Sequence, residues 1–131
     1  TVGHAGSTTT VSATSTSGGS TTVNAYRVNL ARGSGASTAT AVLDSVSAST
    51  FRSAKYNVQV VNAASGSYEL FEANITHDGS SAYVSTFGNV GTSTGLITVA
   101  ADINSGNLRL TGTINNTNDH VVKVVRRVVN V

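Results

Sequence analysis

The side chains of this chain that could carry out acid–base or metal chemistry are three histidines and six carboxylates among 131 residues. The pair that most invites a catalytic interpretation is His77-Asp78, which directly precedes Gly79. Adjacent residues of a strand point to opposite faces, and an aspartate in a turn usually accepts hydrogen bonds from its own backbone. We therefore expect this pair to form a structural turn rather than a metal ligand or a general base.

Glu69 and Glu72 are close enough in the chain to suggest a paired acid and base. Their odd offset places them on opposite faces of a regular strand, so only a β-bulge between them would bring them to one face as a paired acid and base. We expect a solvent-exposed position for them, because unpaired carboxylates are rarely buried. The aspartates lack the dense D-x-D spacing of a calcium loop and are scattered as Asp44, Asp78, Asp102 and Asp119.

Nucleophilic and cofactor chemistry has little support in the composition. The chain has no cysteine, which removes thiolate zinc sites and thiol nucleophiles. It also lacks a Gly-x-Ser-x-Gly elbow and a glycine-rich phosphate loop between a strand and a helix. We predict no catalytic residue, no metal, no cofactor and no small-molecule substrate, so the chain is not expected to be an enzyme.

The formal net charge is +2, and only 11% of the residues are charged. The only cationic cluster consists of Lys123, Arg126 and Arg127, without interleaved aromatic residues on which bases could stack. Strand geometry turns Arg126 away from the other two, so we predict an exposed strand edge rather than a polyanion site. No apolar run approaches the roughly 18 residues of a membrane span. The expected partners therefore include neither nucleic acid nor membrane.

Two regions of different composition divide the chain. Thirteen of the first 22 residues are Ser or Thr, and none of the 22 is Lys, Arg, Asp or Glu. We interpret residues 1–22 as an extended arm, which forms a strand when it pairs with the edge of a sheet. This arm is expected to augment or clasp a neighbouring subunit. Residues 23–131 are expected to form the folded domain.

Strict alternation of apolar and polar residues runs through most of that domain. It is clearest over residues 53–60, 97–103 and 107–114, with turn residues at Asp78-Gly79 and at Asn104-Ser105-Gly106. The pattern predicts an all-β fold, an antiparallel β-sandwich of about seven to nine strands with an extended N-terminal arm. The expected core residues are Tyr56, Val58, Val60, Ile75, Ile97, Val99, Ile103, Leu108, Leu110, Ile114, Val122 and Val124.

One strand is expected to change phase in its middle, because Tyr68 and Leu70 share one alternation while Phe71, Ala73 and Ile75 share the other. A one-residue slip of this kind predicts a β-bulge near Leu70-Phe71.

The last strand, from His120 onward, is apolar on both faces. Such a strand is either central in a sheet or covered by a neighbour, and we expect one of its faces to meet the arm or another chain. The candidate assembly surface is Val11, Val121, Lys123, Val125, Arg127 and Val129.

Several short blocks in a fixed order resemble a β-rich module that recurs in virion structural proteins of tailed phages, especially phages of cyanobacteria. The blocks are residues 43–60, 68–72, 77–83, 101–110 and 122–126, within a region from about Val42 to Val129. The segment Phe71-Glu72-Ala73-Asn74-Ile75-Thr76 is more polar than the hydrophobic strand that this module usually has before His-Asp-Gly. The resemblance implies a non-enzymatic building block of a virus particle and brings no catalytic residues with it.

The expected function is therefore structural, as a capsid decoration or cement-type subunit at the virion surface. Its expected partners are other virion structural proteins and further copies of the chain. The alternatives are a neck or tail-fibre appendage that binds a receptor or glycan, and a subunit of an extracellular filament. A glycan-binding module would need exposed aromatic residues. We expect most of the few candidates to lie in the core, these being Tyr26, Phe51, Tyr68, Tyr83 and Phe87.

Overall fold

The computed structural model describes residues 8–14, 20–30, 40–62, 64–115 and 118–131, with the backbone alone for the first two of these segments. These residues form nine β-strands and no helix. The strands are β1 (Thr8–Thr14), β2 (Ser20–Leu30), β3 (Thr40–Ser47), β4 (Phe51–Asn62), β5 (Ser67–His77), β6 (Ala82–Gly91), β7 (Ile97–Asn104), β8 (Asn107–Ile114) and β9 (His120–Asn130). The predicted all-β class is confirmed.

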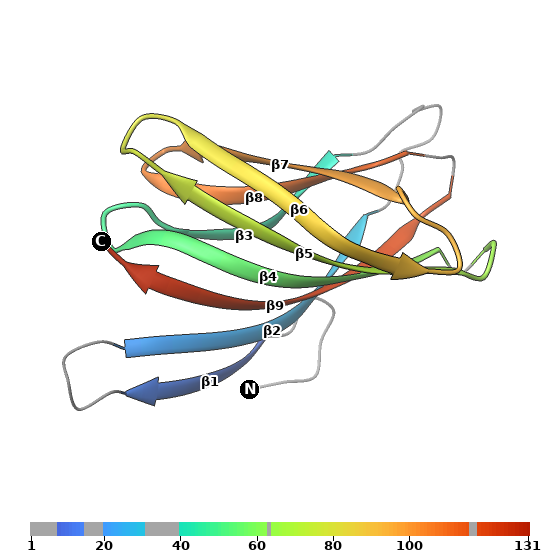
Figure 1. Cartoon of the computed structure of the whole chain (residues 1–131), viewed down its shortest axis with the longest axis horizontal. Helices are drawn as coiled ribbons and strands as arrows, with labels where there is room; N and C mark the ends of the chain where they lie inside the picture. Colours follow the sequence, from blue (N-terminus) through green and yellow to red (C-terminus); the bar gives the residue numbers. More distant parts are fainter. Residues whose placement is uncertain (1–7, 15–19, 31–39, 63, 116–117) are drawn as a thin grey trace.

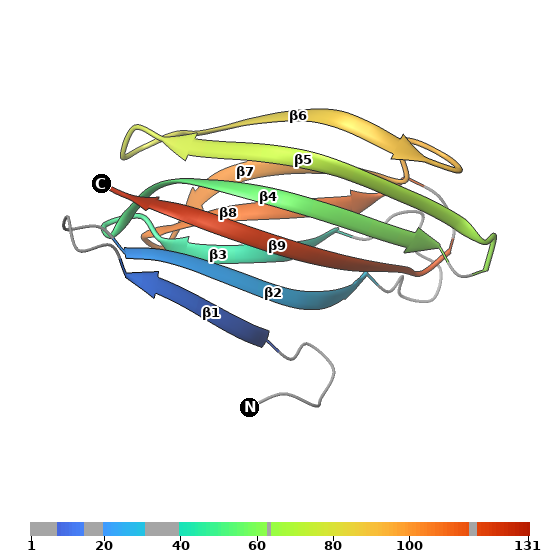
Figure 2. The same ribbon diagram turned by 60° about the horizontal axis from the view of Figure 1, so that its bottom comes forward.

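Two antiparallel sheets pack face to face (Figures 1 and 2). The larger sheet has the order β1-β2-β9-β4-β5-β6, and the smaller has the order β3-β8-β7. The C-terminal strand β9 is therefore an inner strand, hydrogen-bonded to β2 on one side and to β4 on the other. This position explains its apolar composition on one face and leaves its other face to the outside of the sandwich.

The core forms where the alternating side chains of the two sheets meet. In β4, Ala54, Tyr56, Val58 and Val60 all point inward and are buried, while the intervening residues are half-buried or exposed. In β8, Leu108 and Leu110 are fully buried by the same alternation. Burying a side chain of this size stabilises the fold by about 1.5–3 kcal/mol. Ten of the twelve predicted core residues are buried, and the other two, Val99 and Ile103, are partly buried against the same cluster.

A polar contact joins the two sheets inside this apolar layer. Tyr56 on β4 and Arg126 on β9 face each other in the register of the larger sheet, and both reach Asp44 on β3 of the smaller sheet. The Tyr56 hydroxyl donates to Asp44 Oδ2 at 2.5 Å, and Arg126 Nη1 donates to Asp44 Oδ1 at 2.6 Å. Burial, followed by the nearby Asp44 charge, raises the pKa of Tyr56 far above its usual value. The hydroxyl therefore remains a donor to Asp44.

The predicted hairpins are confirmed. Ser105 and Gly106 form a two-residue turn between β7 and β8, with φ angles of 51° and 79°. Two consecutive positive φ angles match a type I′ turn, which suits the twist of antiparallel strands. Between β5 and β6, Asp78 Oδ1 accepts hydrogen bonds from the backbone N–H groups of Ser80 and Ser81. This contact is the self-capping turn that was expected for Asp78.

The prediction of a phase change in β5 is wrong. Residues 69, 71, 73, 75 and 77 are all buried, so β5 alternates regularly, and Tyr68 and Leu70 point outward with Asn74 and Thr76. A register shift does occur here, because Leu70 pairs with Val90 and Glu72 pairs with Phe87. The extra residue belongs to the neighbouring strand β6, where Gly88 has a φ of 70°. An extra residue with positive φ bends the strand that contains it, here β6 rather than β5.

The predicted boundary between arm and domain, at residues 22 and 23, falls inside the continuous strand β2. Strand β1 pairs with β2 of the same chain. Residues 1–7 and 15–19 of the predicted arm lie outside the described residues. The proposed contact of the arm with a neighbouring subunit stays a prediction.

Candidate functional site: the outer face and edge of the larger sheet

The outward face of the larger sheet presents side chains in rows that run across β9, β4, β5 and β6. The strand registers place these residues side by side: Val129, Ser53, Thr76 and Tyr83 in a first row; Arg127, Lys55, Asn74 and Ser85 in a second; Val125, Asn57, Glu72 and Phe87 in a third; and Lys123, Gln59, Leu70 and Val90 in a fourth. Residues directly opposite each other in a sheet point to the same side. The rows therefore form one continuous surface, which we call the outer face.

Four of the six residues of the predicted assembly surface are in these rows, and a fifth, Val121, is on the same side of β9. They alternate along β9, with Val121 half-buried and Lys123, Val125, Arg127 and Val129 exposed. Val125 is 42% exposed and Val129 is 62% exposed, which is high for valines in the middle of a sheet. The sixth residue, Val11, pairs through its backbone with Val23 of β2, and its side chain lies outside the described residues.

The prediction for the basic cluster is confirmed for the directions of its side chains. The predicted strand edge is wrong, because β9 is an inner strand of the larger sheet. Arg126 turns inward to Asp44, with only 15% of its side chain exposed, while Lys123 and Arg127 face outward. The outward cations are not equivalent. Lys55 is 3.4 Å from Glu72 Oε1 and 5.8 Å from the centre of the Phe87 ring. None of the ion pairs found between described residues includes Lys123 or Arg127.

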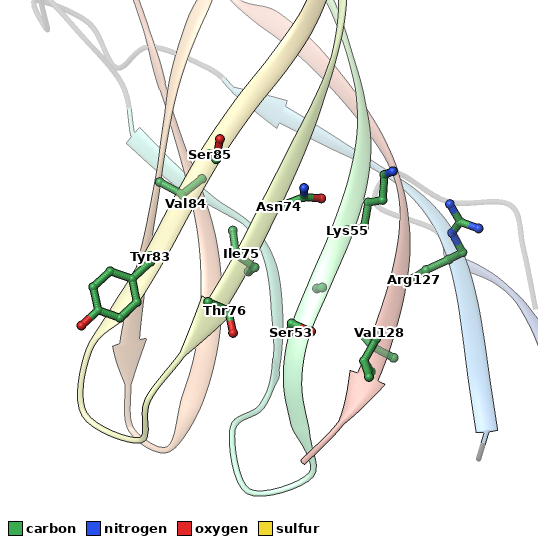
Figure 3. Close-up of a pocket in the computed structure, with 12 residues that line it drawn as sticks. Ser53, Lys55, Asn74, Ile75, Thr76, Tyr83, Val84, Ser85, Arg127 and Val128 are labelled. Carbon is green, nitrogen blue, oxygen red and sulfur yellow. The ribbon is translucent and has the colours of Figure 1, made fainter. Parts of the chain in front are cut away.

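A groove crosses the first two rows of the outer face (Figure 3). It has a volume of about 720 Å³ and extends from Arg127 and Val129 on β9 to Tyr83 and Ser85 on β6. Ala54 and Ile75 of the inner strands also line it, although their side chains point into the core. Polar residues, two cationic residues and one aromatic residue therefore line a single hollow.

The Tyr83 ring at the end of this groove has a defined orientation. Its hydroxyl donates to Asp78 Oδ2 at 3.0 Å. The backbone N–H groups of Ser81 and Ser80 also hydrogen-bond this carboxylate, and together with Tyr83 they hold the pKa of Asp78 far below its usual range. The hydrogen bond to the charged Asp78 in turn raises the pKa of Tyr83. The turn thus anchors the ring while 55% of the residue remains exposed.

Strand β6 is the edge of the larger sheet, and no described strand lies beyond it. Nine of its ten residues are exposed. The strand has no charged residue and no proline, although charges and prolines are the usual protection of a sheet edge. Its bulge at Gly88 is the one protective feature, and it leaves the stretch from Ala82 to Phe87 in regular register with β5.

The expectation that most aromatic residues lie in the core is wrong. Tyr68 is 53% exposed, Tyr83 is 55% exposed and Phe87 is 40% exposed, and all three are on β5 or β6. Phe51 is partly buried, and the side chain of Tyr26 lies outside the described residues. The alternation of β5 and β6 sends these rings outward because the inward positions hold Phe71, Ala73 and Ile75.

The expectation of a solvent-exposed Glu69 is also wrong, because only 2% of this residue is exposed. Its Oε1 accepts from the backbone N–H of Leu96, and its Oε2 accepts from the N–H of Gly95 and from Asn89. The carboxylate therefore fixes the loop that leads from β6 to β7, at 2.8–3.0 Å from each donor. Glu72 is on the opposite face in its ion pair with Lys55, so the two glutamates are separated by the sheet.

The two histidines of the described residues, His77 and His120, have structural surroundings. The ring of His77 is buried, with Nε2 at 2.7 Å from the carbonyl oxygen of Phe51 and Nδ1 accepting from the N–H of Gly79. His120 is buried at the start of β9, with Nδ1 at 2.8 Å from the carbonyl oxygen of Asn118. Within the described part of the chain, no three histidine or carboxylate side chains are close enough to hold a metal ion. The same part contains no helix that is long and apolar enough to cross a membrane.

The chain matches no protein-family model and none of the curated proteins with which it was compared.

Proposed function

We propose that this chain is a non-enzymatic structural subunit of a tailed-phage virion, of the capsid decoration type, and that β6 is one of the edges through which it joins its neighbours. The resemblance of residues 42–129 to the phage module supports the assignment of the chain to a virus particle. The exposed, uncharged edge of β6 carries the argument for assembly.

Edge strands attract other strands because their outer N–H and C=O groups have no partner. A second strand that adds to β6 gains main-chain hydrogen bonds along the regular stretch Ala82–Phe87. Tyr83, Val84 and Phe87 would supply apolar contacts on the two sides of the sheet. The partners proposed here are other virion structural proteins or further copies of the same chain.

A charge on this edge tests the role of β6. Thr86→Lys places an ammonium group in the regular part of β6, and Thr94→Lys makes the same change in the loop between β6 and β7, where Thr94 is exposed. We expect Thr86→Lys to abolish incorporation into particles while Thr94→Lys incorporates normally. Equal incorporation of both variants, each with an unchanged circular dichroism spectrum, would show that the β6 edge is not used.

The location in the particle is tested with a gold-labelled antibody against residues 42–131. Label spread over the heads of purified particles supports capsid decoration. Label confined to the neck or tail assigns the chain to an appendage. Absence of label from all particles rejects the virion proposal, and polymers formed by the purified chain alone would then favour a filament subunit.

A second candidate function is recognition of a receptor or glycan by an appendage. The observation in its favour is the exposure of Tyr68, Tyr83 and Phe87 on neighbouring strands. Exposed aromatic side chains offer flat apolar surfaces with little conformational entropy to lose. A glycan array probed with the purified chain tests this function directly.

A further inference from the structure

We infer that the groove between Arg127 and Tyr83 is a binding site for an acidic oligosaccharide, with the carboxylate or sulfate of the sugar on Arg127. This inference rests on the second candidate function, glycan recognition, and names its site and its ligand class. The groove is lined by residues of four adjacent strands, β9, β4, β5 and β6 (Figure 3).

Charge selects the kind of sugar. Arg127 is exposed at one end of the groove, and it takes part in none of the ion pairs between described residues. The neighbouring Lys55 pairs with Glu72 at 3.4 Å, so Arg127 is the cation of the groove that has no ion-pair partner among the described residues. A guanidinium binds a carboxylate or sulfate through two parallel N–H···O bonds, and a neutral sugar offers no such partner.

Unused polar groups continue along the groove. Among the hydrogen bonds found between described residues, none involves the side chains of Ser53, Asn74 or Ser85, and all three line the hollow. Asn74 and Ser85 are in the same register row as Arg127. Amide and hydroxyl groups both donate and accept, which suits the hydroxyl groups of a sugar ring.

The far end of the groove supplies the apolar contact that a sugar ring also needs. Tyr83 is 55% exposed there, and its hydroxyl is bonded to Asp78, so the ring is held in place before any ligand arrives. A ring that is already ordered loses little entropy on binding. Val129, which is 62% exposed, adds apolar surface at the β9 end. Four strands at about 4.8 Å spacing make the site about 14 Å long, which suits a short oligosaccharide rather than a single sugar.

The chain offers matched controls for both ends of the site. Lys123 has the same charge as Arg127 and is on the same face of β9, four residues or about 13 Å away and outside the groove. Tyr68 is as exposed as Tyr83 and lies outside the groove on β5. The informative comparisons are therefore Arg127→Gln with Lys123→Gln, and Tyr83→Ala with Tyr68→Ala.

Binding is measured by isothermal titration calorimetry on the full chain at low salt. The probes are an oligogalacturonate, a sulfated galactose oligomer and the neutral galactose oligomer of the same length. We expect at least one acidic probe to bind at least about tenfold more tightly than the neutral one, which is about 1.4 kcal/mol. We expect Arg127→Gln and Tyr83→Ala each to weaken that binding about tenfold or more, and the two control variants to change it less than about twofold.

The outcomes separate this inference from the function on which it rests. If no probe and no array glycan binds, both glycan recognition and the acidic site are wrong. If the neutral probe binds as well as the acidic ones, or if Arg127→Gln behaves as Lys123→Gln does, glycan recognition stands and the acidic groove is rejected. Backbone amide NMR spectra of the variants establish that each one is folded.

Discussion

Replacing Arg126 by Met is expected to destabilise the fold strongly, although the substitution removes a polar group from an apolar layer. Arg126 is the cationic partner of Asp44, and the side chains of the two residues are only 15% and 6% exposed. In Arg126→Met the carboxylate of Asp44 stays buried and retains only the hydroxyl of Tyr56 as a hydrogen-bond donor in this contact.

Breaking a buried ion pair by removing one partner costs about 3–5 kcal/mol, because the remaining charge is uncompensated. The total stability of a domain of this size is about 5–15 kcal/mol, so the loss is a large share of it. With a urea dependence of about 2 kcal/mol per molar, the unfolding midpoint should fall by about 1.5–2.5 M. Tyr56→Phe removes a hydrogen bond to the same charged group and should cost about 1.5–3 kcal/mol.

The decisive control removes all three polar groups together. In the variant Asp44→Leu, Tyr56→Phe, Arg126→Met no charge or donor of this contact remains unpaired. Replacement of a buried ion pair by apolar residues of similar volume is often neutral or stabilising. We therefore expect the triple variant to recover most of the stability that Arg126→Met loses, as measured by urea unfolding with circular dichroism detection.

Two results would refute this reasoning. A loss of less than about 1 kcal/mol in Arg126→Met would mean that the Asp44 carboxylate is solvated in the folded state. A triple variant as unstable as Arg126→Met would mean that the packing of the long side chain, and not charge compensation, stabilises the contact.

Three further predictions concern the loops around the sheet edge. Glu69→Gln removes one of two accepting oxygens and should cost about 1–3 kcal/mol, with faster hydrogen exchange of the Leu96 amide as its local signature. Asp78→Asn should lower the unfolding midpoint at pH 7 and flatten the acid side of the stability curve. The folded-state pKa of Asp78 is lowered, so its contribution is present above the unfolded value of about 4 and is lost as the pH falls below it. Gly91→Ala should cost about 1–3 kcal/mol in thermal unfolding, because a Cβ at this position overlaps the carbonyl oxygen of Tyr68 and backbone must move.

Local pattern was sufficient to predict the sandwich and most of its core. The alternation in β4 and β8 is uninterrupted, and the structure buries Tyr56, Val58, Leu108 and Leu110 as the pattern requires. The turn at Asp78 was also predictable, because its hydrogen bonds are to residues two and three positions later. Features that depend on neighbours in sequence were therefore accessible from the sequence.

Features that depend on residues far away in the chain could not be predicted from the sequence. Glu69 is buried because its carboxylate oxygens accept from the amides of Gly95 and Leu96, which are 26 and 27 residues away. No residue near Glu69 in the chain indicates that this loop lies beside it. A signal was present nonetheless, because Glu69 has the same phase as Phe71 and Ala73. Tyr68 has the opposite phase and therefore points outward, which the alternation also predicts once the register shift is assigned to β6. An inward Arg126 required knowledge that Asp44 of the opposite sheet faces it.

The number of strands in the larger sheet determines how copies could join. With six strands and every neighbouring pair antiparallel, the two edge strands β1 and β6 run in opposite directions. A second copy in the same orientation would therefore place its β1 antiparallel to β6, and repetition would continue one sheet with no change of polarity. Neighbouring strands rotate by about 20–25°, so such a ribbon would turn by about 120–150° for each copy added. Head-to-tail joining of this kind is open-ended unless the rotation closes a ring. With five or seven antiparallel strands, the two edge strands would run in the same direction. Copies in one orientation could then form neither the open-ended sheet nor the closed ring by antiparallel pairing of their edges.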